Sequence, residues 1–213
     1  MRALHASSTL HREGRAWARW LLHRLGWRVR FHGFPAPQGV IVGYPHTSNW
    51  DFVLMVLVKW ATGLQVQFLA KHSLFAIPGF SRWLRSLGGV PVDRTAARGV
   101  VAGLVAHIEQ QREQGLGCWI GISPEGTRRL TAGWKSGFYQ LARQAGLPVG
   151  LLRIDYGRRE VALDTFIELS GEPLADYARM AQAYEGVQGF HPQQASPIRP
   201  LPSSNDIPNN PLP

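Results

Sequence analysis

The chain alternates between short apolar runs and longer segments whose apolar residues recur at helical spacing. The short runs are bounded by glycine, proline or polar residues, which is typical of buried strands. The longer segments carry apolar residues three or four positions apart, as amphipathic helices do. We expect strands at 27–32, 39–44, 64–70, 88–92, 117–122, 147–155 and 160–168, and helices at 10–26, 49–62, 73–86, 95–114, 134–145 and 173–184.

This order of elements predicts an α/β fold. Strands that alternate with helices favour a single, mostly parallel sheet that is covered by helices on both faces. Two of the predicted helices have clear apolar stripes, formed by Val53, Val56, Leu57 and Trp60 in one and by Val101, Leu104, Val105 and Ile108 in the other. At 213 residues, of which 45% are hydrophobic, the chain is long enough for one domain with a complete core.

The two ends of the chain differ from its middle. On a helical wheel of the first segment, one arc is apolar and the opposite arc is basic; the arcs consist of Trp17, Trp20, Leu21 and Leu25, and of Arg12, Arg15, Arg19 and His23. Such a helix either packs on the domain with its basic face in water or lies in the plane of an anionic membrane surface. We expect residues 1–26 to associate with membranes and residues 189–213, which are rich in proline, to form a disordered tail.

The charge of the chain indicates an anionic partner. A formal net charge of +9 suits nucleic acid, an anionic membrane or an acidic carrier protein. No stretch reaches the roughly eighteen uncharged apolar residues of a spanning helix, and the N-terminus lacks the apolar core and cleavage site of a signal peptide. The single cysteine, Cys118, fits a reducing compartment. We therefore expect a cytoplasmic protein that is peripheral on the cytoplasmic face of a membrane.

The first chemically informative segment is His46-Thr-Ser-Asn-Trp-Asp51. It follows the predicted strand 39–44, so His46 lies on a turn and Asp51 in the first turn of the next helix. A turn lets the imidazole fold back onto the carboxylate, which predicts a general base and the acid that orients it. Two simpler interpretations remain open: Ser48 and Asp51 fit a capping box, and His46 fits an ordinary loop histidine.

Two further segments follow predicted strands. Ser123-Pro-Glu-Gly-Thr-Arg128 comes after strand 117–122, and the backbone amides near Gly126 and the Arg128 guanidinium suit a phosphate group. The same residues also fit an ordinary helix start. Strand 88–92 ends in Asp93-Arg94, which taken alone is more often a surface ion pair. In open α/β sheets ligands bind at the carboxyl ends of the strands, where all these residues would lie.

Together these segments resemble the blocks of the glycerolipid acyltransferase family, of the lysophosphatidic acid acyltransferase type. The four blocks appear in order, as His46–Asp51, Gly89–Arg94, Pro124–Arg128 and Leu147-Pro-Val149, and Lys71 resembles a lysine that the family carries between the first two. The likeness covers roughly residues 27–165.

The resemblance implies a fold like that of glycerol-3-phosphate acyltransferases, with residues 27–188 as the acyltransferase domain. It implies transfer of a fatty acyl group from acyl-CoA or acyl carrier protein to a lysophospholipid such as 1-acyl-glycerol-3-phosphate. His46 would be the base and Asp51 would fix its tautomer, with no covalent intermediate, no metal and no cofactor besides the acyl donor. The substrate-binding residues implied are Lys71, Arg94, Glu125, Gly126, Thr127 and Arg128.

Three other functions compete with this one. A serine esterase would use Ser123 or Ser48, but the sequence around Ser123 lacks the last glycine of Gly-x-Ser-x-Gly. A basic membrane-binding or nucleic-acid-binding module would explain the charge, but no nucleic-acid recognition motif is present, so we expect no nucleic-acid partner. A zinc hydrolase needs a ligand cluster, and His46, His72 and His107 stand on separate elements without ligand spacing.

Overall fold

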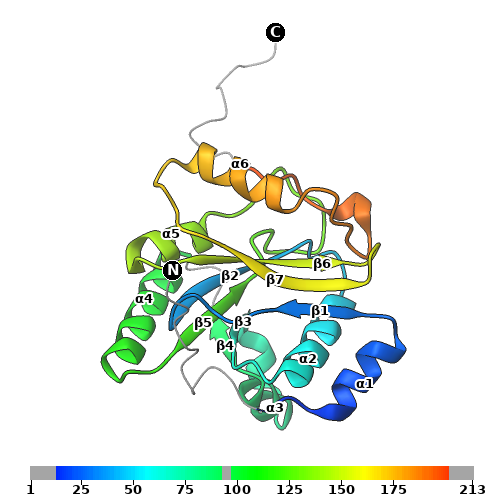
Figure 1. Ribbon diagram of the computed structural model, residues 1–213. Helices are drawn as coiled ribbons and strands as arrows, with labels where there is room; N and C mark the ends of the chain where they lie inside the picture. The colour runs from blue at the N-terminus through cyan, green and yellow to red at the C-terminus, as the bar shows by residue number, and fades with distance from the viewer. Residues whose placement is uncertain (1–12, 93–96, 202–213) are drawn as a thin grey trace.

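The computed structural model describes residues 13–92 and 97–201 (Figure 1). Arg12 and the Asp93-Arg94 pair, which figured in the expectations above, lie outside this part of the chain. The strands are β1 (Arg28–Phe31), β2 (Gln38–Tyr44), β3 (Gln67–Lys71), β4 (Gly89–Val92), β5 (Cys118–Ile122), β6 (Val149–Asp155) and β7 (Glu160–Ile167). The helices are α1 (Ala16–Arg24), α2 (Trp50–Thr62), α3 (Phe80–Ser86), α4 (Ala97–Glu113), α5 (Gly137–Ala145) and α6 (Pro173–Ala183), with short 3₁₀ helices η1 (His72–Ala76) and η2 (Pro192–Gln194).

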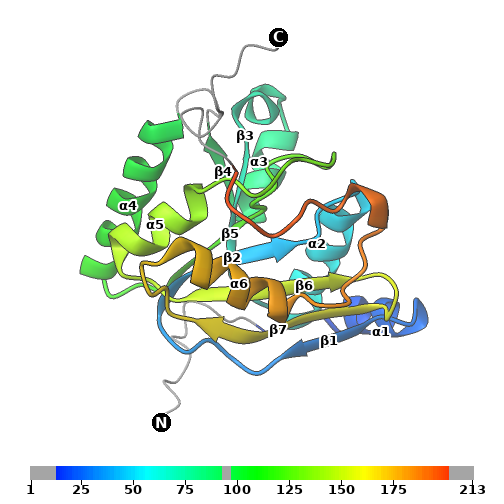
Figure 2. The same cartoon turned by 90° about the horizontal axis from the view of Figure 1, so that it is seen from above.

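The described strands form one seven-stranded sheet in the order β1-β7-β6-β2-β5-β3-β4 (Figure 2). Five neighbouring strands, from β6 to β4, run in the same direction, whereas β7 is antiparallel to β6 and carries β1 parallel to itself. The mostly parallel α/β sheet predicted from the sequence is confirmed. The carboxyl ends of the five parallel strands meet at one edge, which is where the candidate site lies.

Alternation along the central strand β2 divides the core into two layers. Val40, Val42 and Tyr44 face a large cluster that includes buried residues of α4, α5 and α6. Ile41 faces the other side of the sheet, where it packs in a cluster with Trp119. On that same side α1 and α2 pack over β6 and β7. Both faces are therefore covered, as a sheet with buried parallel strands requires.

The apolar stripe of α4 is confirmed, whereas the stripe predicted for α2 is confirmed for Val56, Leu57 and Trp60 and is wrong for Val53. In α2 the side chains that enter the core cluster are Leu54, Val58 and Ala61, whereas Val53 is exposed. Helix α2 is apolar on nearly all sides, so hydrophobic spacing alone does not select its buried face. The neighbouring helix α1 and the sheet make that selection.

The helix predicted at 73–86 is two elements. The 3₁₀ helix η1 ends at Ala76, and α3 begins at Phe80. Pro78 has no amide hydrogen and favours an extended conformation in Ile77, whose ψ is 115°. Gly79 then adopts a φ of 76°, which glycine accepts without strain. The proline and glycine therefore separate the two helices.

Helix α1 packs on α2 through a narrow face. Ala18 and Leu22 are buried against α2, and the Arg15 amide donates to the Trp60 carbonyl over 2.7 Å. The side chain of Trp20 remains 64% exposed. The helix is thus both packed on the domain and tryptophan-bearing on its outer surface. No helix in residues 13–92 or 97–201 combines the length and the apolar composition needed to cross a membrane.

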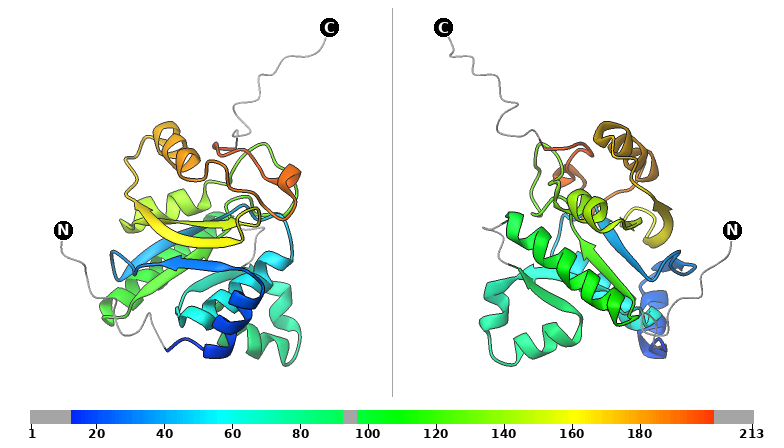
Figure 3. Two further views of the ribbon diagram at one scale, coloured as in Figure 1. Left: turned by 45° about the vertical axis from the view of Figure 1, so that its right-hand side comes forward. Right: turned by 90° about the vertical axis from the view of Figure 1, so that its left-hand side faces the viewer.

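The disordered tail expected from Gly189 is a wrong prediction for residues 189–201. We call residues 187–201 the C-terminal strap, which lies beside the loop that follows β5 (Figure 3). The Trp134 amide donates to the Arg199 carbonyl over 2.8 Å, and the Leu201 amide returns a bond to the Trp134 carbonyl over 2.9 Å. Ser196 is completely buried. The strap is therefore ordered by hydrogen bonds, which composition does not reveal, and not by burial of a large apolar surface.

Candidate functional site

The site begins at the turn between β2 and α2. His46 follows β2 at the carboxyl edge of the sheet, and Asp51 is the second residue of α2. The turn brings the two side chains together, with 3.0 Å between His46 Nδ1 and Asp51 Oδ2. The imidazole is about one-quarter exposed, whereas the carboxylate is buried. The predicted pairing of His46 with Asp51 is therefore present in the structure.

Asp51 is held by several hydrogen bonds besides that of His46. Its Oδ2 accepts from the amides of Thr47 and Ser48 over 2.8 and 2.9 Å, and its Oδ1 accepts from the Tyr156 hydroxyl over 2.9 Å. Burial raises the pKa of Asp51, but the hydrogen bonds from His46, Ser48 and Tyr156 outweigh it, so the net pKa is below its usual value. The carboxylate is ionised at neutral pH.

The ionised carboxylate determines the tautomer of His46. An ionised carboxylate can only accept hydrogen bonds, so the proton of the neutral imidazole lies on Nδ1. Nε2 then carries a lone pair and can accept a proton, as a general base must. The amides of Thr47 and Ser48 bond the same oxygen, so Asp51 also caps the start of α2. Capping and orientation are two effects of one carboxylate, not alternatives.

Tyr156 is a residue of the site that the motifs did not indicate. It follows the last residue of β6, and its hydroxyl reaches Asp51, 105 residues earlier in the chain. Burial and the hydrogen bond to Asp51 raise the pKa of Tyr156, so it remains a donor. No spacing rule links the two residues. The sequence signal was that Tyr156 directly follows the strand predicted at 147–155.

Glu125 differs from the expectation that it contacts substrate. It is completely buried, and its carboxylate accepts from the His46 amide over 2.6 Å and from the Ser196 amide over 2.9 Å. Burial raises the pKa of Glu125, whereas the bonds from Ser196 and His46 oppose that shift. Glu125 therefore connects the His46 turn to the C-terminal strap.

The rest of the Pro124–Arg128 loop forms a turn. Gly126 has a φ of 66°, and its amide donates to the Ser123 carbonyl over 3.2 Å. That amide is engaged in the turn, whereas the sequence predicted that it would contact a phosphate group. The Thr127 hydroxyl accepts from the Arg129 amide over 3.3 Å. The turn directs Arg128 and Arg129 outward, and both are exposed.

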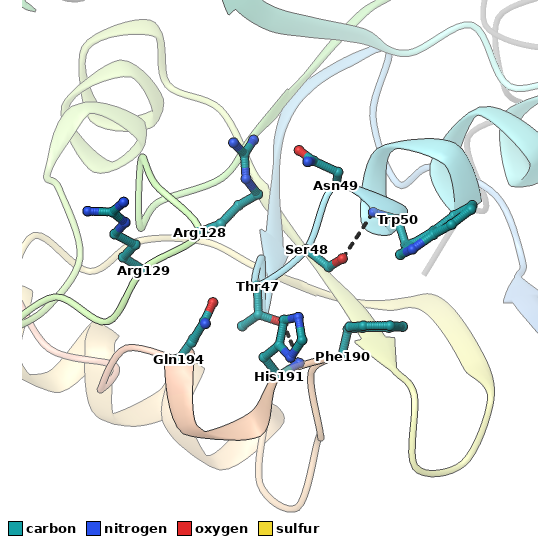
Figure 4. Close-up of a pocket in the computed structure, with 9 residues that line it drawn as sticks. All are labelled: Thr47, Ser48, Asn49, Trp50, Arg128, Arg129, Phe190, His191 and Gln194. Atoms are coloured by element: carbon teal, nitrogen blue, oxygen red, sulfur yellow. Dashed lines mark hydrogen bonds between the residues drawn. The ribbon is translucent and has the colours of Figure 1, made fainter.

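A pocket of about 380 Å³ lies between the His46 turn, this loop and the strap (Figure 4). It is lined by Thr47, Ser48, Asn49, Trp50, Arg128, Arg129, Phe190, His191 and Gln194. Among the predicted substrate-binding residues, only Arg128 belongs to this lining. Lys71 is exposed at the carboxyl end of β3, two strands from β2. Arg94 lies outside the described residues.

The candidate serine nucleophiles lack a base. The buried Ser123 hydroxyl has no hydrogen-bond partner, and the Ser48 hydroxyl accepts from the Trp50 amide over 3.1 Å. A serine hydrolase requires its nucleophile to bond a base, so this arrangement does not favour one. Within residues 13–92 and 97–201, no three side chains of His, Cys, Asp or Glu converge to hold a metal ion.

The fold and the site define an α/β domain with a histidine–aspartate pair beside an arginine-lined pocket. The family model described as Acyltransferase matches residues 28–151, which include this pair and the loop with Arg128. The chain belongs to this acyltransferase family.

Two individual proteins resemble it. One is a 1-acyl-sn-glycerol-3-phosphate acyltransferase from Borreliella burgdorferi, 33% identical over 123 residues. That match covers 55% of this chain, and it spans only about half (47%) of the relative's own length. The other is the crystal structure of PlsC, the 1-acyl-sn-glycerophosphate acyltransferase of Thermotoga maritima. It aligns with a TM-score of 0.50 and 20% identity over 79% of this chain and 73% of PlsC, and so supports the fold alone.

Proposed function

We propose that this protein transfers a fatty acyl group from an acyl thioester to the free hydroxyl of a lysophospholipid. The acceptor class we favour is 1-acyl-glycerol-3-phosphate, and the donor is acyl-CoA or acyl carrier protein. The observation that carries the proposal is the 3.0 Å contact between His46 Nδ1 and the buried Asp51 carboxylate. The name of the Borreliella burgdorferi relative supports the choice of acceptor.

The proposed reaction proceeds without a covalent acyl-enzyme. His46 Nε2 removes the proton of the acceptor hydroxyl while the oxygen attacks the thioester carbonyl carbon. The tetrahedral intermediate collapses with cleavage of the carbon–sulfur bond, and the imidazolium returns its proton to the thiolate. Asp51 stabilises the imidazolium between these steps. A general base of this kind contributes about 10²–10⁴-fold, and positioning of the two substrates supplies much of the rest.

The direct test uses purified full-length protein with acyl-CoA and with acyl carrier protein as donors. A panel of lysophospholipids serves as acceptors, and products are identified by mass. We expect diacylated product with the phosphate-bearing acceptor and release of one thiol per product. If the protein hydrolyses simple esters and transfers no acyl group to any acceptor, it is an esterase and this proposal is wrong.

Arg128 and Arg94 are expected to bind the phosphate of the acceptor, with Lys71 in support. A guanidinium binds phosphate with two parallel hydrogen bonds, which a lysine cannot reproduce. We expect Arg128→Ala to raise the acceptor KM about thirty- to a hundredfold, because one charged hydrogen-bonding contact contributes roughly 2–3 kcal/mol. Arg128→Lys should be nearly as harmful. Acceptor KM is measured at saturating donor.

Arg28→Ala is the matched control for that measurement. Arg28 is an exposed arginine of the edge strand β1, outside the pocket, so its loss changes the net charge equally. Its acceptor KM should stay near that of the wild type. An equal rise in both variants would mean that overall charge, not a phosphate contact, governs use of the acceptor.

We also propose that α1 rests on the cytoplasmic face of an anionic membrane, so that the acceptor enters from the leaflet. Trp17 and Trp20 on this helix and Leu25 directly after it are exposed, as are the basic residues Arg15, which precedes the helix, and Arg19. Exposed tryptophans next to arginines suit an interfacial helix. Each arginine near an anionic surface contributes about 1 kcal/mol, which salt reduces.

Trp20→Ala should weaken binding to vesicles that contain anionic lipid by about ten- to a hundredfold, since a large apolar side chain that enters the interface contributes roughly 1.5–3 kcal/mol. Vesicle flotation measures this effect. Leu174→Ala is the control, because Leu174 is a 79% exposed apolar residue on α6, which covers the opposite face of the sheet. Unchanged flotation of Trp20→Ala would place the membrane contact elsewhere.

A further inference from the structure

We propose that the C-terminal strap is the second wall of the acceptor pocket, and that His191 contacts the acceptor phosphate together with Arg128. This inference rests on the function proposed above and deepens it. The family match ends at residue 151, so the strap lies beyond the blocks that the family shares. The residues in question are Phe190, His191 and Gln194, all of which line the pocket.

The strap is bonded both to the His46 turn and to the Arg128 loop. The His191 amide donates to the Thr47 hydroxyl over 3.1 Å. Gly189 lies so close to Thr47 that a Cβ there would come within 2.7 Å of its hydroxyl oxygen. In the orientation that satisfies its neighbours, the Gln194 amide donates to the carbonyls of Thr47 and Arg128. The strap therefore bridges the His46 turn and the Arg128 loop.

Aromatic contacts hold the His191 side chain in the pocket wall. Its ring packs edge-on against Phe190, with 4.8 Å between the ring centroids. Phe190 in turn packs on Tyr156 at 5.2 Å, and Tyr156 donates to Asp51. Figure 4 shows the imidazole on the strap side of the pocket, across from the Arg128 segment. A ring held by packing and by its own backbone amide loses little freedom when it binds a ligand.

The chemistry of the lining selects an anion. Of its side chains, two are guanidinium groups and one is an imidazole; hydroxyl and amide groups provide further donors, and no carboxylate is among them. Such a set of donors suits a phosphate group, which offers only acceptor oxygens when it is fully ionised. The arginines approach from the loop after β5, whereas His191 approaches from the strap. A phosphate in this pocket would be held from two sides.

The kinetic test compares His191→Ala and His191→Gln with Gln193→Ala in the full-length protein. Both His191 variants keep the backbone bond to Thr47. Gln193 is exposed on the same 3₁₀ turn and does not line the pocket, so it controls for disturbance of the strap. We expect His191→Ala to raise the KM for 1-acyl-glycerol-3-phosphate about tenfold. The kcat, the donor KM and the thermal midpoint should stay within about twofold or 2 °C of the wild type.

A binding test that needs no turnover accompanies it. Glycerol 3-phosphate is titrated into the wild type while the imidazole signals are followed by NMR, and the His191 signal is identified by its loss in His191→Gln. We expect that signal to shift saturably with glycerol 3-phosphate and not with glycerol. If the wild type is active, an unchanged acceptor KM in His191→Ala overturns the inference. A fall in the kcat and stability of His191→Ala without a rise in acceptor KM overturns it as well. If the wild type transfers no acyl group, the proposed function fails, and the titration alone decides whether His191 binds phosphate.

Discussion

His46→Ala should lower the turnover number by about 10²–10⁴-fold, the range that general base catalysis supplies. Nε2 of His46 is the atom with a lone pair at this turn, because Nδ1 bonds the Asp51 carboxylate. Alanine removes the base and leaves the backbone amide of residue 46 free to keep its bond with Glu125. The turnover number at saturating donor and acceptor, with thermal unfolding beside it, measures the effect.

His32→Ala is the control for this variant, since His32 is an exposed histidine outside the pocket lining. It should leave turnover unchanged. His46→Ala should also retain the far-ultraviolet circular dichroism spectrum and most of the thermal stability of the wild type, because the imidazole is partly exposed. Full turnover in His46→Ala would remove the histidine from the mechanism, whatever its contact with Asp51.

Asp51→Asn should reduce both turnover and stability. An amide cannot stabilise the imidazolium as a carboxylate does, and a reversed tautomer of His46 becomes competitive, so we expect turnover to fall by roughly 10²–10⁴-fold. The variant also weakens the buried bonds from the amides of Thr47 and Ser48. Weakened hydrogen bonds to a buried charged group lower the free energy of unfolding by about 1–3 kcal/mol.

The stability effect should depend on pH in a defined direction. The pKa of Asp51 in the folded protein is lowered from the ordinary value of 3.8. Its contribution to stability is therefore complete above that value and is lost as the pH falls through the folded pKa. The difference in thermal midpoint between the wild type and Asp51→Asn should be large at pH 7 and shrink below about pH 4.

Tyr156→Phe separates the two roles of Asp51. It removes only the bond to Oδ1 and leaves the cap on Thr47 and Ser48 intact. We expect a smaller loss of turnover in Tyr156→Phe than in Asp51→Asn.

The outcome that would contradict a catalytic role for Asp51 comes from Asp51→Asn itself. If this variant has a lower thermal midpoint but the turnover number of the wild type, Asp51 acts only as a helix cap.

Local pattern was sufficient to predict most of the elements. Strand and helix periods depend on neighbours within a few residues, so α4 and the parallel strands follow from the sequence. The pairing of His46 with Asp51 was predictable for the same reason, because five residues and one turn connect them. The convergence of the His46 and Arg128 segments was also predictable, since carboxyl ends of parallel strands share an edge.

Other features depend on contacts between distant parts of the chain. The buried face of α2 was chosen by α1 and the sheet, and the position of Glu125 by the backbone amides of His46 and Ser196. Composition indicated a disordered end, because the strap has few large apolar residues. Composition does not count backbone hydrogen bonds, and these attach the strap to the loop around Trp134.

By itself, then, the sequence determined the α/β class, the His46–Asp51 pair and the arginine at the carboxyl edge, all of which depend on local spacing and strand direction. Only the tertiary structure decided that Tyr156 bonds Asp51, that Glu125 is buried beneath the His46 turn and that His191 lines the pocket. These residues are separated from their partners by 79 to 144 positions. Contacts at that distance carry no periodic signal, because the packing of the whole domain brings their partners together.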